Sequence, residues 1–234
     1  MHVEKTGNPF GKPSVKRAEW IKKKALEDIP IRILKEGDDV DVLYFVDSYG
    51  SYDPRIQDIA LSIVKSLHIA GVDFGILGPH EKDSGHQVRR MGEEGLFQLL
   101  VEENLEILKG IRFKRIITTD PHAFNTLKND YPASFEVYHY LQVFLSLIET
   151  GRLKPTNHLK NNDIYTYHDP CYLGRHNEIY NEPRKLLNSL PGLNLVEMES
   201  SKDRSFCCGG GDIILWHEIE QEEMRMAEKR IHMA

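Results

Sequence analysis

The chain has 234 residues, enough for one large domain or two small ones, and its 36 acidic and 30 basic residues give a net charge of −6. This negative balance argues against a nucleic-acid-binding protein, which usually carries an excess of basic side chains. No apolar run approaches the roughly 18 residues of a membrane span, and the amino-terminal residues lack the apolar stretch of a signal peptide. Three cysteines in so long a chain do not make a disulfide scaffold, so we expect a cytoplasmic protein.

The first half of the chain alternates predicted strands and helices. Residues 1–38 form an arm that ends in a predicted basic amphipathic helix, residues 15–27, with its charged face in solvent. Residues 39–155 hold the first alternating unit, in which Asp53 and Pro54 are the expected N-cap and first position of a helix. Its predicted strands are 41–46, 72–77, 115–119 and 135–139, and its helices include 54–70, 88–109 and 140–150. Alternation of this kind predicts a parallel sheet with ligands at the carboxyl ends of its strands.

The second half, residues 156–234, repeats the first. Strands at 164–168 and 193–198 flank a helix opened by Pro183, and a last helix is expected at 218–233. Cys171 then takes the place of Ser48 in the repeat, and Cys207 takes the place of Asp83. Cys171 and Cys207 are 36 residues apart, and Ser48 and Asp83 are 35 residues apart. The sequence therefore predicts an α/β fold of two pseudo-repeated Rossmann-like halves with parallel sheets, the second half truncated.

All three cysteines lie in two predicted strand-to-helix connections of the second half, as Cys171 and the pair Cys207-Cys208. Free cysteine often only fills a core. A vicinal pair followed by Gly209 and two further glycines is not typical of core filling, because adjacent side chains reach one ligand only where the backbone bends. Soft thiolates are the preferred ligands of iron–sulfur clusters.

This pattern resembles the cysteine-rich "CCG" domain of heterodisulfide reductase catalytic subunits and related glycolate and lactate oxidase and electron-transfer-flavoprotein-linked oxidoreductases. The family motif is a cysteine, a Cys-Cys-Gly and a Cys-x-x-Cys, and the first two parts stand here as Cys171 and Cys207-Cys208-Gly209. The resemblance implies an iron–sulfur electron-transfer subunit, with a 4Fe-4S cluster, cubane or noncubane, on Cys171, Cys207 and Cys208. It implies that Gly209 lets the backbone approach the cluster, and that a flavoprotein or ferredoxin-like iron–sulfur subunit is the partner.

Two departures from the family pattern matter. In the first half, the resemblance implies cysteines where Ser48, Asp83, Asp120 and Ala123 stand, so we interpret that half as a pseudo-site without a cluster. A minor interpretation is that Asp83, Asp120 and His122 bind a hard metal or a small polar ligand. In the second half, the last strand and its Cys-x-x-Cys turn are expected to be absent, because the sequence stops 25 residues after Gly209.

The ligand set is therefore incomplete, since cubane clusters usually take four cysteines. The fourth ligand would come from a partner chain, from solvent, or from His168, although a histidine at a strand end is more often a hydrogen-bonding residue.

Two further hypotheses remain open. The chain can be a non-catalytic scaffold subunit without a functional cluster, which the lost ligands of the first half favour. It can also perform thiol chemistry without metal, through a Cys207–Cys208 vicinal disulfide or through Cys171 activated by His168.

Overall fold

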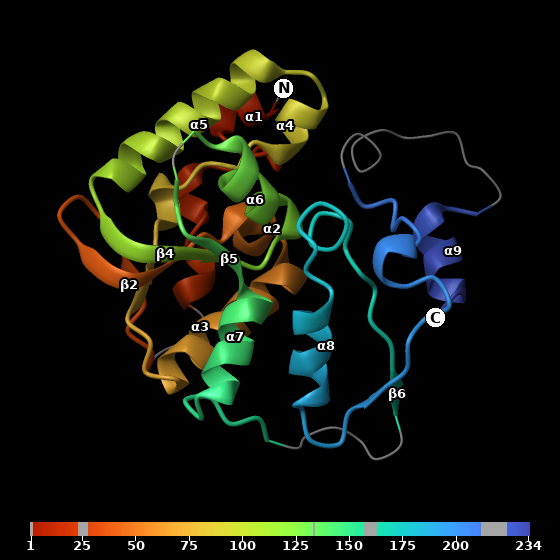
Figure 1. Cartoon of the computed structure of the whole chain (residues 1–234). Helices are drawn as coiled ribbons and strands as arrows, with labels where there is room; N and C mark the ends of the chain where they lie inside the picture. The colour runs from red at the N-terminus through yellow and green to blue at the C-terminus, as the bar shows by residue number, and fades with distance from the viewer. Residues whose placement is uncertain (1, 23–27, 133, 157–162, 212–223) are drawn as a thin grey trace. The chain divides into compact units, whose positions relative to one another are not determined.

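The protein is described here by a computed structural model (Figure 1), which describes residues 2–22, 28–132, 134–156, 163–211 and 224–234. The chain divides into two compact units, Met1–Val143 and Phe144–Ala234. The domain limits expected from the sequence, at 38/39 and 155/156, remain a prediction.

The first unit contains a five-stranded sheet in which every pairing is parallel, so the predicted α/β class is confirmed. The strand order is β1-β3-β2-β4-β5. In the middle of the sheet Leu43 stands between Gly75 and Ile116. Gly75 is required there because a Cβ would lie 2.5 Å from the Leu34 side chain. The strands are β1 (Arg32–Ile33), β2 (Asp39–Tyr44), β3 (Phe74–Ile76), β4 (Arg112–Thr118) and β5 (Val137–His139).

Helices cover both faces of this sheet. Figure 1 shows α5 on one side of the sheet and α3 on the other. The order of the strands reverses between β2 and β4, and open parallel sheets bind ligands at such a point, beyond the carboxyl ends of the strands. The α-helices of this unit are α1 (His2–Thr6), α2 (Asp47–Tyr52), α3 (Pro54–Ile69), α4 (His86–Arg90), α5 (Glu94–Lys109) and α6 (Pro121–Asn125).

Helix α3 begins as the sequence predicts. The Asp53 carboxylate accepts a hydrogen bond from the Arg55 N–H at 2.9 Å, and Pro54 occupies the first helical position. An aspartate cap satisfies one of the backbone donors that a helix start leaves without a partner, which is why this signal is reliable. Leu61, Ile63 and Leu67 then bury the inner face of the helix.

Two predicted helices are wrong. Residues 15–27 do not form an amphipathic helix in their described part, which holds only the 3₁₀ turns η1 (Ser14–Lys16) and η2 (Glu19–Lys22). Residues 88–109 form two helices, α4 and α5, because the chain turns at Gly92 with a φ of +84°. A positive φ strains any residue with a Cβ, and glycine is therefore the usual residue that ends a helix in this way.

The second unit is built around a two-stranded parallel sheet of β6 (Ile164–Tyr165) and β7 (Asn194–Leu195). The strands are shorter than predicted. The connecting helix α8 (Asn181–Asn188) begins two residues before Pro183. Helix α7 (Tyr140–Glu149) spans the limit of the two units, η6 (Lys202–Arg204) follows β7, and α9 (Met226–His232) lies within the predicted last helix, whose residues 218–223 fall outside the described part.

Among the helices formed by described residues, none combines the length and the apolar character needed to cross a membrane.

Candidate metal centre

The three cysteines follow the two strands of the second unit. Cys171 lies in the turns after β6, and Cys207 and Cys208 lie in the loop after β7. Because β6 and β7 are parallel, their carboxyl ends meet at the same edge of the sheet. The fold thus brings the two cysteine segments, 36 residues apart in sequence, to one end of the unit.

The sulfur atoms accept backbone hydrogen bonds. The Gly209 N–H donates to Cys207 Sγ and the Gly210 N–H donates to Cys208 Sγ, each at 3.4 Å. Gly209 has a φ of +69°, which bends the backbone so that both amides reach the sulfurs. Burial raises the pKa of the Cys171 thiol, and the charges of Cys207 and Cys208 raise it further while Arg175 opposes them.

Asp169 joins the two cysteine segments. Its carboxylate accepts two hydrogen bonds from the Arg184 guanidinium, at 2.7 and 2.8 Å, and one from the Lys202 N–H at 2.7 Å. Its carbonyl oxygen accepts the Ser205 hydroxyl at 3.1 Å. Lys202 and Ser205 belong to the segment that leads to Cys207, so one buried side chain links both segments to α8.

Arg175 makes a second link between the segments. Its Nη1 donates to the carbonyl oxygen of Ser205 at 2.7 Å and to that of Asp203 at 3.3 Å. Arg175 comes four residues after Cys171, and Ser205 comes two residues before Cys207. A guanidinium that serves two carbonyl groups fixes their geometry as well as satisfying them.

His168 binds protein side chains. Its Nδ1 accepts a hydrogen bond from Arg230 Nε at 2.9 Å, and the Ser205 hydroxyl lies 3.5 Å from the same atom. Arginine can only donate, so Nδ1 carries no proton and the imidazole is neutral. Burial, followed by the charge of Arg230, lowers the pKa of His168, which agrees with this state.

The donor set fits an iron–sulfur cluster. Three thiols at one edge, two of them accepting amide N–H groups, supply soft sulfur ligands and the hydrogen bonds that tune such clusters. Within the described ranges no three histidine, cysteine, aspartate or glutamate side chains stand close enough to bind one metal ion. A cluster places its thiolates on different iron atoms, so its ligands do not need to converge in that way.

In the first unit, the two positions that correspond to Cys171 and Cys207 in the repeat lie in contact. Ser48 Oγ donates to Asp83 Oδ2 at 2.6 Å, although 35 residues separate them. The Arg17 guanidinium reaches the same place, 3.4 Å from Ser48 Oγ and 3.2 Å from Glu81 Oε1. Arg17 is only 2 % exposed. The expectation that this basic segment has a solvated charged face is therefore wrong at Arg17.

Buried carboxylates surround this guanidinium. Asp47 accepts the Ser48 N–H at 2.7 Å and the Ser84 hydroxyl at 2.7 Å, and Glu81 accepts the backbone N–H groups of Val46 and Asp47. Burial raises the pKa of Asp47 well above its ordinary value, and the charges of Asp83 and Asp120 raise it further. Polar side chains of the first unit thus occupy the position at which the family resemblance implies a cluster.

The third position of the pseudo-site is a helix cap. Asp120 accepts the His122 N–H at 2.7 Å and the Ala123 N–H at 3.4 Å, and its carboxylate lies 3.1 Å from His122 Nδ1. Burial alone would raise the pKa of Asp120, but the hydrogen bonds and charge of His122 lower it. Asp83, Asp120 and His122 belong to no metal-binding group in the part of the chain that the structure describes, so the hard-metal interpretation finds no support.

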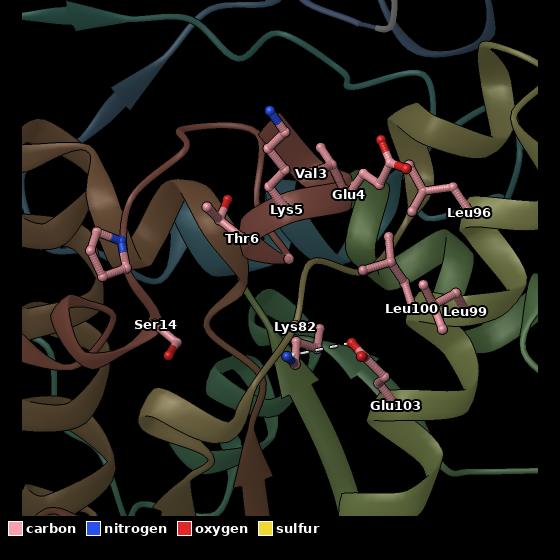
Figure 2. A pocket seen from close by; sticks show the side chains of 12 residues that line it. Val3, Glu4, Lys5, Thr6, Ser14, Lys82, Leu96, Leu99, Leu100 and Glu103 are labelled. Atoms are coloured by element: carbon pink, nitrogen blue, oxygen red, sulfur yellow. Dashed lines mark ion pairs between the residues drawn. The ribbon is translucent and has the colours of Figure 1, made fainter. Parts of the chain in front are cut away.

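A separate cavity of about 330 Å³ lies in the first unit, between α1 and α5 (Figure 2). Leu96, Leu99 and Leu100 of α5 form its apolar wall, and Lys82 pairs with Glu103 at 3.4 Å along its edge. All of its lining residues belong to the first unit, so it is not part of the cysteine edge.

Sequence reasoning singled out the three cysteines and Gly209, whose role as a cluster site stays a prediction, but missed the residues that link their segments. Asp169 stood beside Cys171 in the motif without a role, and its partner Arg184 gave no signal because it lies in an ordinary charged helix. Arg17 and Arg230 were also missed, since a charged residue in a polar segment is usually solvated.

Fold and site together define an α/β protein with paired thiol-bearing loops at the carboxyl ends of parallel strands. Residues 165–234 match the family model described as "Cysteine-rich domain" (CCG). The chain therefore carries a CCG cysteine-rich domain, and the resemblance drawn from Cys171 and Cys207-Cys208-Gly209 is confirmed.

Curated relatives agree with this family. The chain is 44% identical to the "Probable iron-sulfur-binding oxidoreductase FadF" of Bacillus subtilis, over 93% of this chain and 31% of the relative. It is 36% identical to the "EtfAB:quinone oxidoreductase" of Syntrophomonas wolfei, over 94% and 31%. It is 32% identical to a subunit of the dihydromethanophenazine:CoB–CoM heterodisulfide reductase of Methanosarcina barkeri, over 87% and 49%. The chain thus spans a third to a half of the length of these relatives. No solved structure matches it.

Proposed function

We propose that the second unit holds an iron–sulfur cluster through Cys171, Cys207 and Cys208, and that the chain transfers electrons within a larger oxidoreductase of the heterodisulfide-reductase kind. The observation that carries this proposal is the pair of cysteine segments at the carboxyl ends of β6 and β7, linked by Asp169 and Arg175. The names of the relatives, two of which are oxidoreductases and one a part of a heterodisulfide reductase, support the same role.

The cluster we propose is of the 4Fe-4S type, with its fourth ligand supplied from outside the three cysteines. His168 is a poor candidate because its Nδ1 accepts the Arg230 hydrogen bond. A flavoprotein or a ferredoxin-like iron–sulfur module is the proposed electron partner, since one relative is named as an EtfAB:quinone oxidoreductase. The cytoplasm, or its membrane face through partners, remains the proposed location.

For the first unit we propose a scaffold role. Ser48 donates a hydrogen bond to Asp83 and accepts one from Arg17, and none of the three side chains is a thiol. This polar network belongs to the first unit. It favours the interpretation that the first unit keeps the fold of a cluster domain without binding a cluster.

Anaerobic reconstitution with iron and sulfide tests the proposal. The wild-type protein, Cys207→Ser and a triple variant with serine at 171, 207 and 208 are each analysed for iron, for acid-labile sulfide and by EPR. The triple variant gives the background from iron bound without a specific site. We expect the wild type to hold iron and sulfide in equal amounts, and Cys207→Ser to lose most of both.

Two results would contradict the proposal. Wild-type iron no higher than in the triple variant would favour a scaffold role for the whole chain. A Cys207–Cys208 disulfide that opens and closes reversibly in the metal-free protein, seen by mass spectrometry, would favour thiol chemistry instead.

A further inference from the structure

One face of α9 packs against both cysteine segments. A Cβ built on Gly209 would lie 3.0 Å from Met226 Cβ, so the start of α9 touches the loop of Cys207 and Cys208. Arg230 is one turn further along the same face, because residues four apart in a helix are neighbours. Its Nε donates to His168 Nδ1, three residues before Cys171. Figure 1 shows α9 beside the end of the 200–211 segment.

Arg230 is a buried cation with unused donors. It is 5 % exposed, and its Nη1 and Nη2 atoms are buried without a hydrogen-bond partner among the described residues. Buried guanidinium groups are almost always paired, since removing their charge from water is costly unless an acceptor replaces the water. His168 cannot serve the Nη atoms as an anion because it is neutral and already accepts from Nε.

An anion would satisfy these donors, and the proposed function supplies one. A cluster on three thiolates carries negative charge on its cysteine and inorganic sulfur atoms, which accept hydrogen bonds. We propose that Arg230, oriented by His168, donates from its Nη atoms to the sulfur of the cluster and stabilises the reduced form. Arg230 is thus a positioning and tuning residue, and this inference rests on the cluster proposed above.

The electrostatic consequence has a definite sign. One-electron reduction adds one negative charge to the cluster without forming or breaking a bond. A buried guanidinium beside it favours that extra charge, and buried charges are screened less than exposed ones. Removing the guanidinium therefore lowers the reduction potential.

The test compares Arg230→Gln, Arg230→Lys and Lys229→Gln after anaerobic reconstitution of the whole chain. Lys229 is an exposed cation on the same helix, so Lys229→Gln removes the same charge away from the site. Each protein is titrated with dithionite and followed by EPR. For Arg230→Gln we expect reduction to become about tenfold less favourable, a shift of 59 mV for a one-electron couple. Arg230→Lys, which keeps the charge, and Lys229→Gln are expected to stay near the wild-type potential.

The outcomes separate the two proposals. Wild-type protein without a cluster would overturn the proposed function, and this inference with it. A wild-type cluster whose potential and EPR signal are unchanged in Arg230→Gln would overturn the role of Arg230 alone. If Arg230→Gln loses the cluster and Arg230→Lys keeps it, the charge requirement is supported. Loss from both variants, with Lys229→Gln loaded, would indicate a packing role and overturn the proposal.

Discussion

Arg17 shows how much one buried cation can organise. Its guanidinium reaches Ser48 and Glu81 in the first unit, and the positive charge lies among Glu81, Asp47 and Asp83. Burial alone would lower the pKa of Arg17, but the charges of Glu81 and Asp47 raise it, so the arginine stays charged. Because burial removes these carboxylates from water, the stability of the fold around them depends on the positive charge of Arg17.

We therefore expect Arg17→Met to destabilise the first unit by about 3–5 kcal/mol, the usual result when one member of a buried ion pair is removed. Urea unfolding measures the loss. Lys16→Met is the matched control, because Lys16 is the exposed neighbour in the same turn, and it should change stability by no more than about 0.5 kcal/mol. Equal effects from the two variants would show that Arg17 is not a structural ion-pair partner.

Asp47 gives the first unit a predictable pH response. Its pKa is raised above the ordinary value, first by burial and then by Asp83 and Asp120, so the folded state holds the proton more tightly than the unfolded chain. Stability from this group is therefore present below its ordinary pKa and decreases as the pH rises from there toward the raised value.

Asp47→Asn removes this titration while keeping the shape. The amide oxygen can still accept from Ser48, and the Ser84 hydroxyl can accept from the amide nitrogen. We expect the stability of the variant relative to wild type to increase as the pH is raised above about 4, measured by urea unfolding at a series of pH values. Asp58→Asn, at an exposed position on α3, controls for the lost negative charge. A relative stability that falls with pH would contradict the argument.

At the scale of elements, the cysteine loops owe their arrangement to the strands and to the bonds between the loops. The strands β6 and β7 are only two residues long and cannot fix loops that extend well beyond them. Asp169 and Arg175 do so, with four hydrogen bonds to the segment 202–205.

Asp169→Asn should loosen this arrangement. The variant has an amide nitrogen, which is a donor, in place of one carboxylate oxygen. This nitrogen cannot accept from Arg184 or Lys202, so the bidentate pair between residue 169 and Arg184 is lost. The loss is expected to stay below the about 3–5 kcal/mol of a broken buried pair, because Glu197 still binds Arg184. Iron release to a chelator from the reconstituted protein should be faster than in wild type. Asp203→Asn, an exposed carboxylate in the same segment, is the control, and equal release rates would exclude the linking role.

Some elements could be predicted from the sequence because their signals are local. Asp53 and Pro54 mark the start of α3 whatever surrounds them, and the apolar run of β2 identifies a buried strand. Arg17 could not be placed, because its burial depends on Glu81 and Ser48, which are 64 and 31 residues away. Arg230 was missed for the same reason, since its contact with His168 spans 62 residues.

At the scale of the whole molecule, the two units place comparable loops at the carboxyl ends of parallel strands. Cys171 and Cys207 follow β6 and β7 in one unit, as Ser48 and Asp83 follow β2 and β3 in the other. The units differ in what fills the site. In the first, Ser48 and Asp83 lie in hydrogen-bond contact, which leaves no space for a cluster between them.

The lost cysteines are therefore not the whole difference between the units. A variant with cysteine at 48, 83, 120 and 123 restores the ligands that the family resemblance implies. We still expect it to bind no more iron per chain than wild type after anaerobic reconstitution, because Arg17 and Glu81 continue to occupy the place. Circular dichroism would establish that the variant is folded. Iron and sulfide at twice the wild-type level would show that the thiols alone decide where a cluster forms, and that the buried guanidinium does not exclude it.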